Sequence, residues 1–159
     1  MQNNNIAKIL KLGFIINIFD FNLIQRWAEK KINEEHYDDD IAELLFSRNK
    51  EKGEVIELLN RLENGSDDKI VKSFFLSLFY QELKNNRKKY WKNIEKKMYE
   101  LFSIDDLKKD DFILRLNDDY LLRREGFSGN INQPVELFNY LKNENNELLI
   151  EEFWKSVMW

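Results

Sequence analysis

Residues 66–84, with the sequence SDDKIVKSFFLSLFYQELK, constrain the fold of this chain more than any other stretch. Ser66 is expected to cap a helix here, because the two aspartates that follow it suit the positive end of a helix dipole. Apolar residues occupy most of the helical circumference, and the polar residues form one narrow strip. Such a helix must be covered on several sides, so we predict that it is the central helix of the protein. The residues expected in its core contacts are Phe74, Phe75, Leu78 and Phe79.

The composition indicates an all-α protein. The 159 residues include only 5 Gly and 1 Pro, too few turn formers for a β-sandwich of this length. Hydrophobic residues make up 43% of the chain, enough for one domain with a full core. We therefore predict a single α-helical domain over residues 1–159, a bundle of about seven to nine short helices around the helix at 66–84.

Capping residues and apolar spacing predict the helices that come before it. Residues 6–19 are expected to form a first helix with Asn5 as its cap, or an extended arm that becomes helical, because Gly13 and Asn17 interrupt the helical pattern. Asp20 or Asn22 is expected to cap the second helix. A third helix follows the run of aspartates at 38–40, and the residues expected on its buried side are Ile41, Leu44, Leu45 and Phe46.

Residues 112–124 allow two structures. The stretch is either a hairpin that turns at Asn117 and Asp118, or helical, with Asn117 capping the second of two short helices. We favour the helical interpretation, because aspartates at 118 and 119 suit a first turn and Arg123 and Arg124 suit a last one.

No motif for catalysis, a metal or a cofactor stands out. The absence of Cys excludes thiol chemistry and cysteine-ligated zinc. The single histidine, His36, fits a surface loop, because a transition-metal site usually takes two or more His or Cys ligands. Three pairs of adjacent aspartates fit helix caps better than Mg²⁺ sites, because neighbouring side chains on a helix point about 100° apart. These pairs are Asp105 with Asp106, Asp110 with Asp111, and Asp118 with Asp119. We expect no catalytic residue, no metal and no cofactor, and therefore not an enzyme.

The sequence favours a bacterial cytoplasmic protein. The apolar run LGFIINIF near the N-terminus lacks a small-residue cleavage site and falls short of the roughly 20 apolar residues of a membrane span. We therefore expect neither a signal peptide nor a membrane partner. A chain without Cys suits a reducing cytoplasm, and its many Asn, Lys and Ile are typical of an AT-rich bacterial genome.

Charge is distributed unevenly along the chain. Residues 33–68 carry 12 acidic and 4 basic side chains, whereas residues 69–109 carry 11 basic and 5 acidic ones. The basic helix expected at 87–97, with Tyr90 and Trp91 among its lysines, is the best nucleic-acid candidate. The alternative for this helix is a solvated face, because Trp91 falls on the apolar stripe with Ile94.

The acidic block at 33–68 is the feature that most favours a protein partner. Part of it is explained by helix caps and by the polar sides of helices, and the rest suits a basic partner that is steered by charge. The expected acidic contacts are Asp38, Asp39, Asp40, Glu43, Glu51, Glu54 and Glu57. A second and weaker surface is expected at Arg123 and Arg124, and the expected buried anchors are Tyr37 and Phe127.

Two stretches, DDDIAELLFSRNKEKGEVIELLNRL and DDYLLRREGFSGNINQPVELFNYLKNE, together with the size of the chain and its lack of Cys, resemble the small, acidic, helical immunity proteins of bacterial contact-dependent toxin systems. The resemblance implies a protein that binds one cognate toxin, often an RNase or another nuclease, and blocks its active site. It carries over no individual residue.

Two other functions stay open at this stage. One is a non-catalytic RNA-binding or regulatory module that uses the basic helix at 87–97. The other is an enzyme whose site is assembled from Asp, Glu and Arg residues scattered along the sequence.

Overall fold

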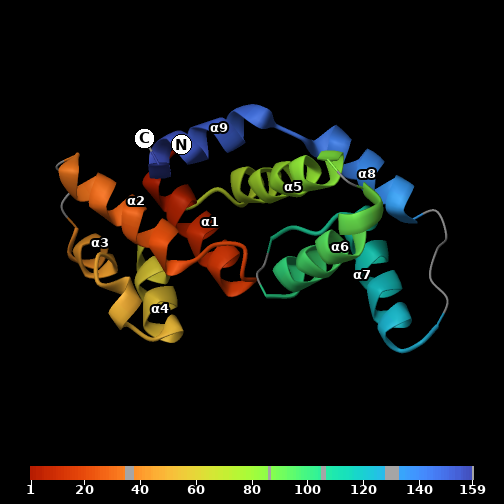
Figure 1. The fold of residues 1–159 in the computed structure, drawn as a ribbon, viewed down its shortest axis with the longest axis horizontal. Coiled ribbons are helices and arrows are strands. Elements are labelled where there is room, and N and C mark those ends of the chain that lie inside the picture. Colours follow the sequence, from red (N-terminus) through yellow and green to blue (C-terminus); the bar gives the residue numbers. More distant parts are fainter. Residues whose placement is uncertain (35–37, 86, 105–106, 128–132, 159) are drawn as a thin grey trace. The chain divides into compact units, whose positions relative to one another are not determined.

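The protein is all-α, as the sequence predicts (Figure 1). The computed structural model describes residues 1–34, 38–85, 87–104, 107–127 and 133–158, without the side chains of residues 85 and 87–89. Within these residues there is no β-strand, and the chain forms nine α-helices and one 3-10 helix. The helices are α1 (Asn3–Ile15), α2 (Phe21–Asn33), α3 (Asp39–Leu44), η1 (Ser47–Asn49), α4 (Lys52–Leu62), α5 (Asp68–Asn85), α6 (Arg87–Ile104), α7 (Asp111–Arg124), α8 (Gln133–Glu144) and α9 (Glu147–Met158).

The helices group into two compact units. Unit 1 comprises Met1–Val71 and Leu148–Trp159, and unit 2 comprises Lys72–Glu147, so the boundaries fall within α5 and after the first residue of α9. The single domain over 1–159 stays a prediction.

Unit 1 contains a helix, α1, that is buried all round. Every residue from 5 to 14 is buried, including two lysines. Lys8 donates to Asp68 at 2.8 Å, and Lys11 donates to Glu63 at 2.5 Å and to Asn60. Long aliphatic stems allow a lysine to cover apolar surface while its ammonium group reaches a partner. The lysines therefore do not place α1 on the surface.

The helix predicted over 6–19 ends earlier, at Ile15. Asn17 takes a left-handed conformation, with φ 56°, and the chain turns back so that Ile18 and Phe19 donate their backbone N–H groups to the carbonyl of Gly13. A Cβ on Gly13 would lie 2.1 Å from a ring carbon of Phe19, so glycine makes room for this turn. The interruptions in the sequence mark the end of the helix.

Asn5 does not cap α1. It lies within the helix, is buried, and accepts a hydrogen bond from the backbone N–H of Asp67 at 2.7 Å. Ser66 does not cap the later apolar helix either. That helix, α5, begins at Asp68, and the side chain of Asp67 accepts from the N–H of Lys69. Asp67 takes the capping position because its carboxylate reaches the second amide of the helix.

Helix α5 has the burial predicted for it. Phe74, Phe75 and Phe79 are fully buried, whereas Leu78 is half-buried. The expected caps of α2 and α3 are also confirmed, since Asp20 accepts from the N–H of Leu23 and Asp38 accepts from the N–H of Asp40.

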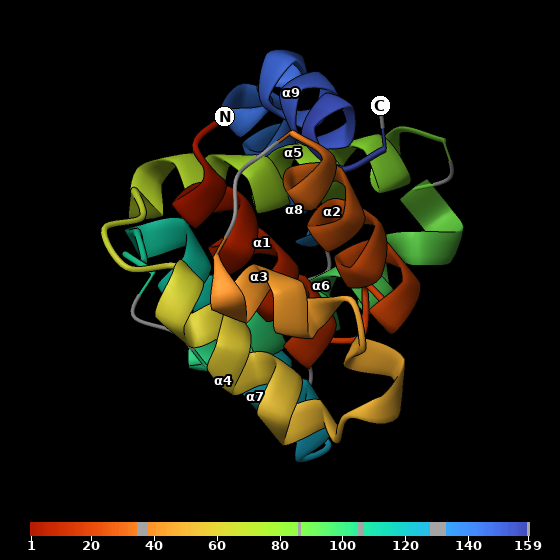
Figure 2. The ribbon, with the colours of Figure 1, turned by 90° about the vertical axis from the view of Figure 1, so that its left-hand side faces the viewer.

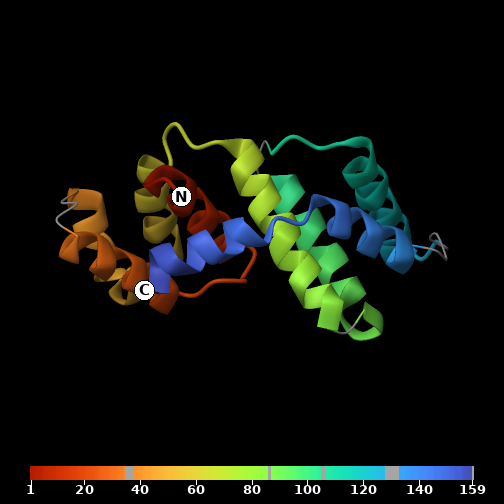
Figure 3. The same cartoon turned by 90° about the horizontal axis from the view of Figure 1, so that it is seen from above.

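Unit 2 contains α6, α7 and α8, which Figure 3 shows from above. Helix α6 packs on both of the others. Residues 112–124 belong to one continuous helix, so the hairpin and the break at Asn117 are both wrong. The cap is Asp110, whose side chain accepts from the N–H of Ile113 at 3.0 Å. Asp118 and Asp119 consequently lie in the interior of α7 and cap nothing.

A buried polar cluster joins the three helices of unit 2. Glu95 of α6 is only 2% exposed and pairs with Arg123 of α7. Gln133 of α8 donates to Glu95 at 2.5 Å and accepts from Arg123, so the three side chains form a closed ring of hydrogen bonds. Because each charge has a partner, the ring fixes α6, α7 and α8 together without leaving a buried ion unpaired.

Candidate protein-binding surface

Helices α3 and α4 of unit 1 lie against each other (Figure 2). Both helices carry exposed acidic residues. Ile41 and Leu44 are the buried residues of α3, and Val55, Leu58 and Leu59 are those of α4. The polar residues of both helices therefore point to solvent. We call this surface the acidic face, and its residues are Asp39, Asp40, Glu43, Glu54 and Glu57.

Arg61 is the cation that holds the acidic face together. Its guanidinium binds both carboxylate oxygens of Asp40, at 2.6 Å and 3.0 Å, and so connects α4 to α3. The hydrogen bond to Asp40 raises the pKa of Arg61, and the nearby charges of Glu43 and Glu57 raise it further. The same bond lowers the pKa of Asp40. At least three carboxylates therefore surround the one guanidinium of Arg61, and the net charge of this cluster is negative.

The structure separates the predicted acidic contacts into two groups. The carboxylates of the first group already have a partner within unit 1. Asp38 caps α3, and Asp40 binds Arg61. Glu43 pairs with Lys50 at 3.1 Å, and Glu54 accepts from the backbone N–H of Glu51. Glu51 itself is the N-cap residue of α4.

The second group keeps its charge exposed. Asp39 and Glu57 are exposed, and neither forms an ion pair within the described residues. These two carboxylates are the parts of the acidic face that a partner can pair with at least cost to the fold.

The burial predicted for Phe46, which follows α3, is wrong. The residue was expected on the buried side of the third helix, but its side chain is 64% exposed. Helix α3 ends at Leu44, and the chain turns through residues 45 and 46 into η1, so the helical spacing used for the prediction no longer applies at position 46. An exposed Phe directly after the acidic helix is the kind of aromatic residue that anchors interfaces.

The other predicted contacts lie in unit 2 or outside the described residues. Arg123 belongs to the buried ring with Glu95, whereas Arg124 and Phe127 are exposed and Phe127 is 62% accessible. Tyr37 and His36 lie outside the described residues.

The basic helix of unit 2 is partly neutralised by its own acids. Lys96 and Lys97 both pair with Glu100, at 3.6 Å and 3.3 Å. Trp91 is half-buried, and both Lys92 and Arg123 lie over its ring, each 5.7 Å from the ring centre. A shallow pocket of about 370 Å³ lies beside it, lined by Lys92, Glu95, Tyr120, Arg123 and Arg124.

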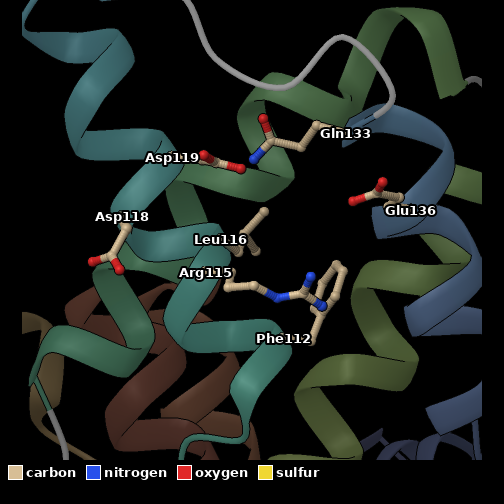
Figure 4. Close-up of a pocket in the computed structure, with 7 residues that line it drawn as sticks. All are labelled: Phe112, Arg115, Leu116, Asp118, Asp119, Gln133 and Glu136. Carbon is tan, nitrogen blue, oxygen red and sulfur yellow. The ribbon is translucent and has the colours of Figure 1, made fainter.

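A further pocket of about 360 Å³ lies between α7 and α8 (Figure 4). Arg115 lies against the ring of Phe112, and Asp119 points toward Gln133, while Asp118 points away from the other labelled side chains. The residues that line it are Phe112, Arg115, Leu116, Asp118, Asp119, Gln133 and Glu136. Its charged and polar lining consists of Asp, Glu, Arg and Gln side chains, without a histidine, hydroxyl or thiol group.

The described residues contain no group of three or more His, Cys, Asp or Glu side chains placed to hold a metal ion. No helix in the described part of the chain is long and apolar enough to cross a membrane. The chain matches no protein-family model, no curated protein and no solved structure.

Proposed function

We propose that this protein is an immunity protein, which binds a cognate bacterial toxin in the cytoplasm and blocks the toxin's active site. The observation that carries the proposal is the acidic face, with Asp39 and Glu57 exposed beside a cation that is already paired, and with Phe46 exposed next to it. The resemblance of two stretches of the sequence to immunity proteins supports the same class of function.

Charge complementarity favours a nuclease as the toxin, and the resemblance to immunity proteins favours an RNase among nucleases. The substrate cleft of such an enzyme must be basic, because it holds phosphates. An acidic surface that covers the cleft would pair with the same cations and exclude the substrate. Exposed charges of this kind chiefly raise the rate of association, whereas a buried aromatic anchor slows dissociation. We therefore assign the steering role to Asp39 and Glu57, and the anchoring role to Phe46.

The test is co-expression with a candidate toxin domain, sought in the gene next to this one, followed by kinetics on the purified complex. A double variant, Asp39→Lys with Glu57→Lys, is expected to slow association about tenfold or more at low salt, and the difference should shrink as the ionic strength rises. Phe46→Ala is expected to speed dissociation instead. The matched control is Glu82→Lys with Glu151→Lys, which makes the same change in net charge at two exposed sites that lie on neither α3 nor α4.

Unchanged association of the Asp39 and Glu57 variant, with full protection of cells, would refute the acidic face as the binding surface. A toxin that binds neither the wild type nor any variant would refute the function itself.

RNA binding by α6 and α7 is the second candidate. The exposed residues Lys92 and Arg124, which line the pocket of about 370 Å³, favour it. It is less well supported, because the ring of Trp91 already has two cations over it and is not open to stack on a base. Fluorescence anisotropy with a single-stranded RNA, compared between wild type and Lys92→Glu, distinguishes it from toxin binding.

A further inference from the structure

Helix α7 of unit 2 exposes a face that combines leucines with a line of acids. Leu114, Leu121 and Leu122 are 48%, 36% and 45% exposed. At 100° per residue, all three lie within about 60° of Asp118 around the helix axis. The exposed residues Asp111 and Glu125 lie close to Asp118 in the same projection, because they are seven positions away on either side. We call this surface the leucine face.

The leucine face is not needed to hold unit 2 together. The buried residues of α7 are Ile113 and Leu116, on the opposite side of the helix. Figure 4 shows Asp118 on the outer side of α7, pointing away from Gln133 and Glu136 of α8. A surface helix normally keeps its apolar residues on its buried stripe, so three exposed leucines on one face indicate a contact beyond this unit.

Two of the three acids lack a local explanation in helix stability, whereas Asp111 lies in the first turn of α7, where the helix dipole favours an acid. Asp118 lies in the middle of α7, where Asp is a weak helix former. Glu125 is the C-cap residue, at the negative end of the helix dipole, where a carboxylate is unfavourable. Neither position suits an acid for the sake of the fold alone.

We propose that the leucine face binds an amphipathic helix of a partner protein, one that carries Lys or Arg between its apolar positions. The apolar side chains of that helix would pack on Leu114 and Leu121 on one side of the acidic line and on Leu122 on the other. Its cations would pair with Asp111, Asp118 and Glu125, which repeat every seven residues as a helical partner requires.

Charge excludes a second copy of this chain as the favoured occupant. If two α7 helices met antiparallel about Asp118, that residue would face its own copy and Asp111 would face Glu125. A parallel pair would bring each acid against its own copy. Like charges at every contact of the line disfavour both arrangements, whereas a basic helix satisfies all three acids.

The leucine face belongs to unit 2 and the acidic face to unit 1. An experiment can therefore refute either proposal without refuting the other. The probe is a 21-residue helical peptide of three heptads, with leucine at the two apolar positions of each heptad and arginine between them. Binding to the full chain is measured by titration calorimetry. The wild type is expected to bind this peptide with a Kd on the order of micromolar, and to bind a version with glutamate in place of arginine at least tenfold more weakly.

The variants assign the binding to α7. Asp118→Lys is expected to weaken binding about tenfold or more, and so is Leu121→Ser with Leu122→Ser. The matched controls are Glu82→Lys and Leu148→Ser, whose positions are exposed elsewhere and which should bind as the wild type does. Circular dichroism spectra identical to wild type establish that each variant is folded.

Three results would overturn the proposal. Equal affinity for the arginine and glutamate peptides, or no effect of Asp118→Lys, would mean that the leucine face is only a solvated surface. A dimer in sedimentation velocity that is lost in the Leu121 and Leu122 variant would assign the face to a second copy of the chain.

Discussion

Asp110 is the residue of unit 2 whose replacement gives the sharpest test of the fold. Its carboxylate caps α7 through the N–H of Ile113 at 3.0 Å, accepts from the hydroxyl of Tyr140 at 2.6 Å, and pairs with Lys72 at 3.1 Å. Burial raises the pKa of the Tyr140 hydroxyl, and the bond to Asp110 raises it further, so this group stays a donor at neutral pH. One side chain thus connects α5, α7 and α8.

The contacts of Asp110 determine how much the free energy of unfolding falls when its side chain is removed. Loss of the cap costs about 1 kcal/mol. Loss of the hydrogen bond from Tyr140 to a charged acceptor costs about 1.5–3 kcal/mol. The ion pair with Lys72 adds at most about 1 kcal/mol, because the Asp110 side chain is 40% exposed. Asp110→Ala should therefore lower the free energy of unfolding by roughly 3–4 kcal/mol, measured by urea denaturation at pH 7.

Asp110→Asn separates the cap from the charge. Asparagine caps a helix as well as aspartate does, and it still accepts a neutral hydrogen bond from Tyr140, so this variant should lose only about 1 kcal/mol. The control is Asp111→Asn, an exposed residue in the first turn of α7, which should stay within about 0.5 kcal/mol of wild type.

The pH dependence tests the charge directly. Burial alone would raise the pKa of Asp110, but the bonds from Tyr140, from the Ile113 amide and from Lys72 outweigh it, and the pKa is lowered below 3.8. The stabilisation is therefore fully present above the ordinary carboxyl pKa and is lost as the pH falls through the lower folded value. The difference between wild type and Asp110→Asn should shrink on acidification. If it stayed constant from pH 7 to pH 2, or if Asp110→Ala cost less than Asp110→Asn, the assigned contacts of Asp110 would be incorrect.

Two further predictions test the cores. Phe75→Ala and Phe79→Ala, at fully buried positions, should each lower the free energy of unfolding by about 3–5 kcal/mol in urea denaturation. Leu148→Ala, at a position 69% exposed, should change it little. Unchanged melting of both Phe variants would contradict the burial of α5. Gly13→Ala should destabilise by roughly 1–3 kcal/mol, because its Cβ would lie 2.1 Å from the Phe19 ring; a stabilised variant, as expected for alanine at an open helical position, would mean that the turn after α1 is loose.

The sequence predicted the helices wherever apolar spacing and a capping residue agreed. Asp20 and Asp38 stand one position before helices with a clear buried stripe, and both caps are confirmed. The full burial of α1 could not be predicted, because the partners that neutralise Lys8 and Lys11 lie about 50 to 60 positions later in the sequence. Spacing within a helix contains no information on such distant partners.

The candidate site shows the same limit. The acidic character of α3 and α4 follows from the sequence, and so does the exposure of Asp39 and Glu57. Which acids are already neutralised could not be predicted, since Asp40 meets Arg61 only when two helices pack together. Phe46 was missed because its position depends on where α3 ends, and the sequence gives no cap signal at that point.

The ring formed by Glu95, Arg123 and Gln133 makes the interior of unit 2 resistant to stepwise substitution. Changing any one of the three leaves a buried charge or amide without its partner, which costs several kcal/mol, whereas a simultaneous change of all three to apolar residues of similar volume can be neutral or even stabilising. Mutational drift at these positions therefore has to pass through less stable intermediates. A designer who wishes to stabilise this unit should replace the three residues in one step.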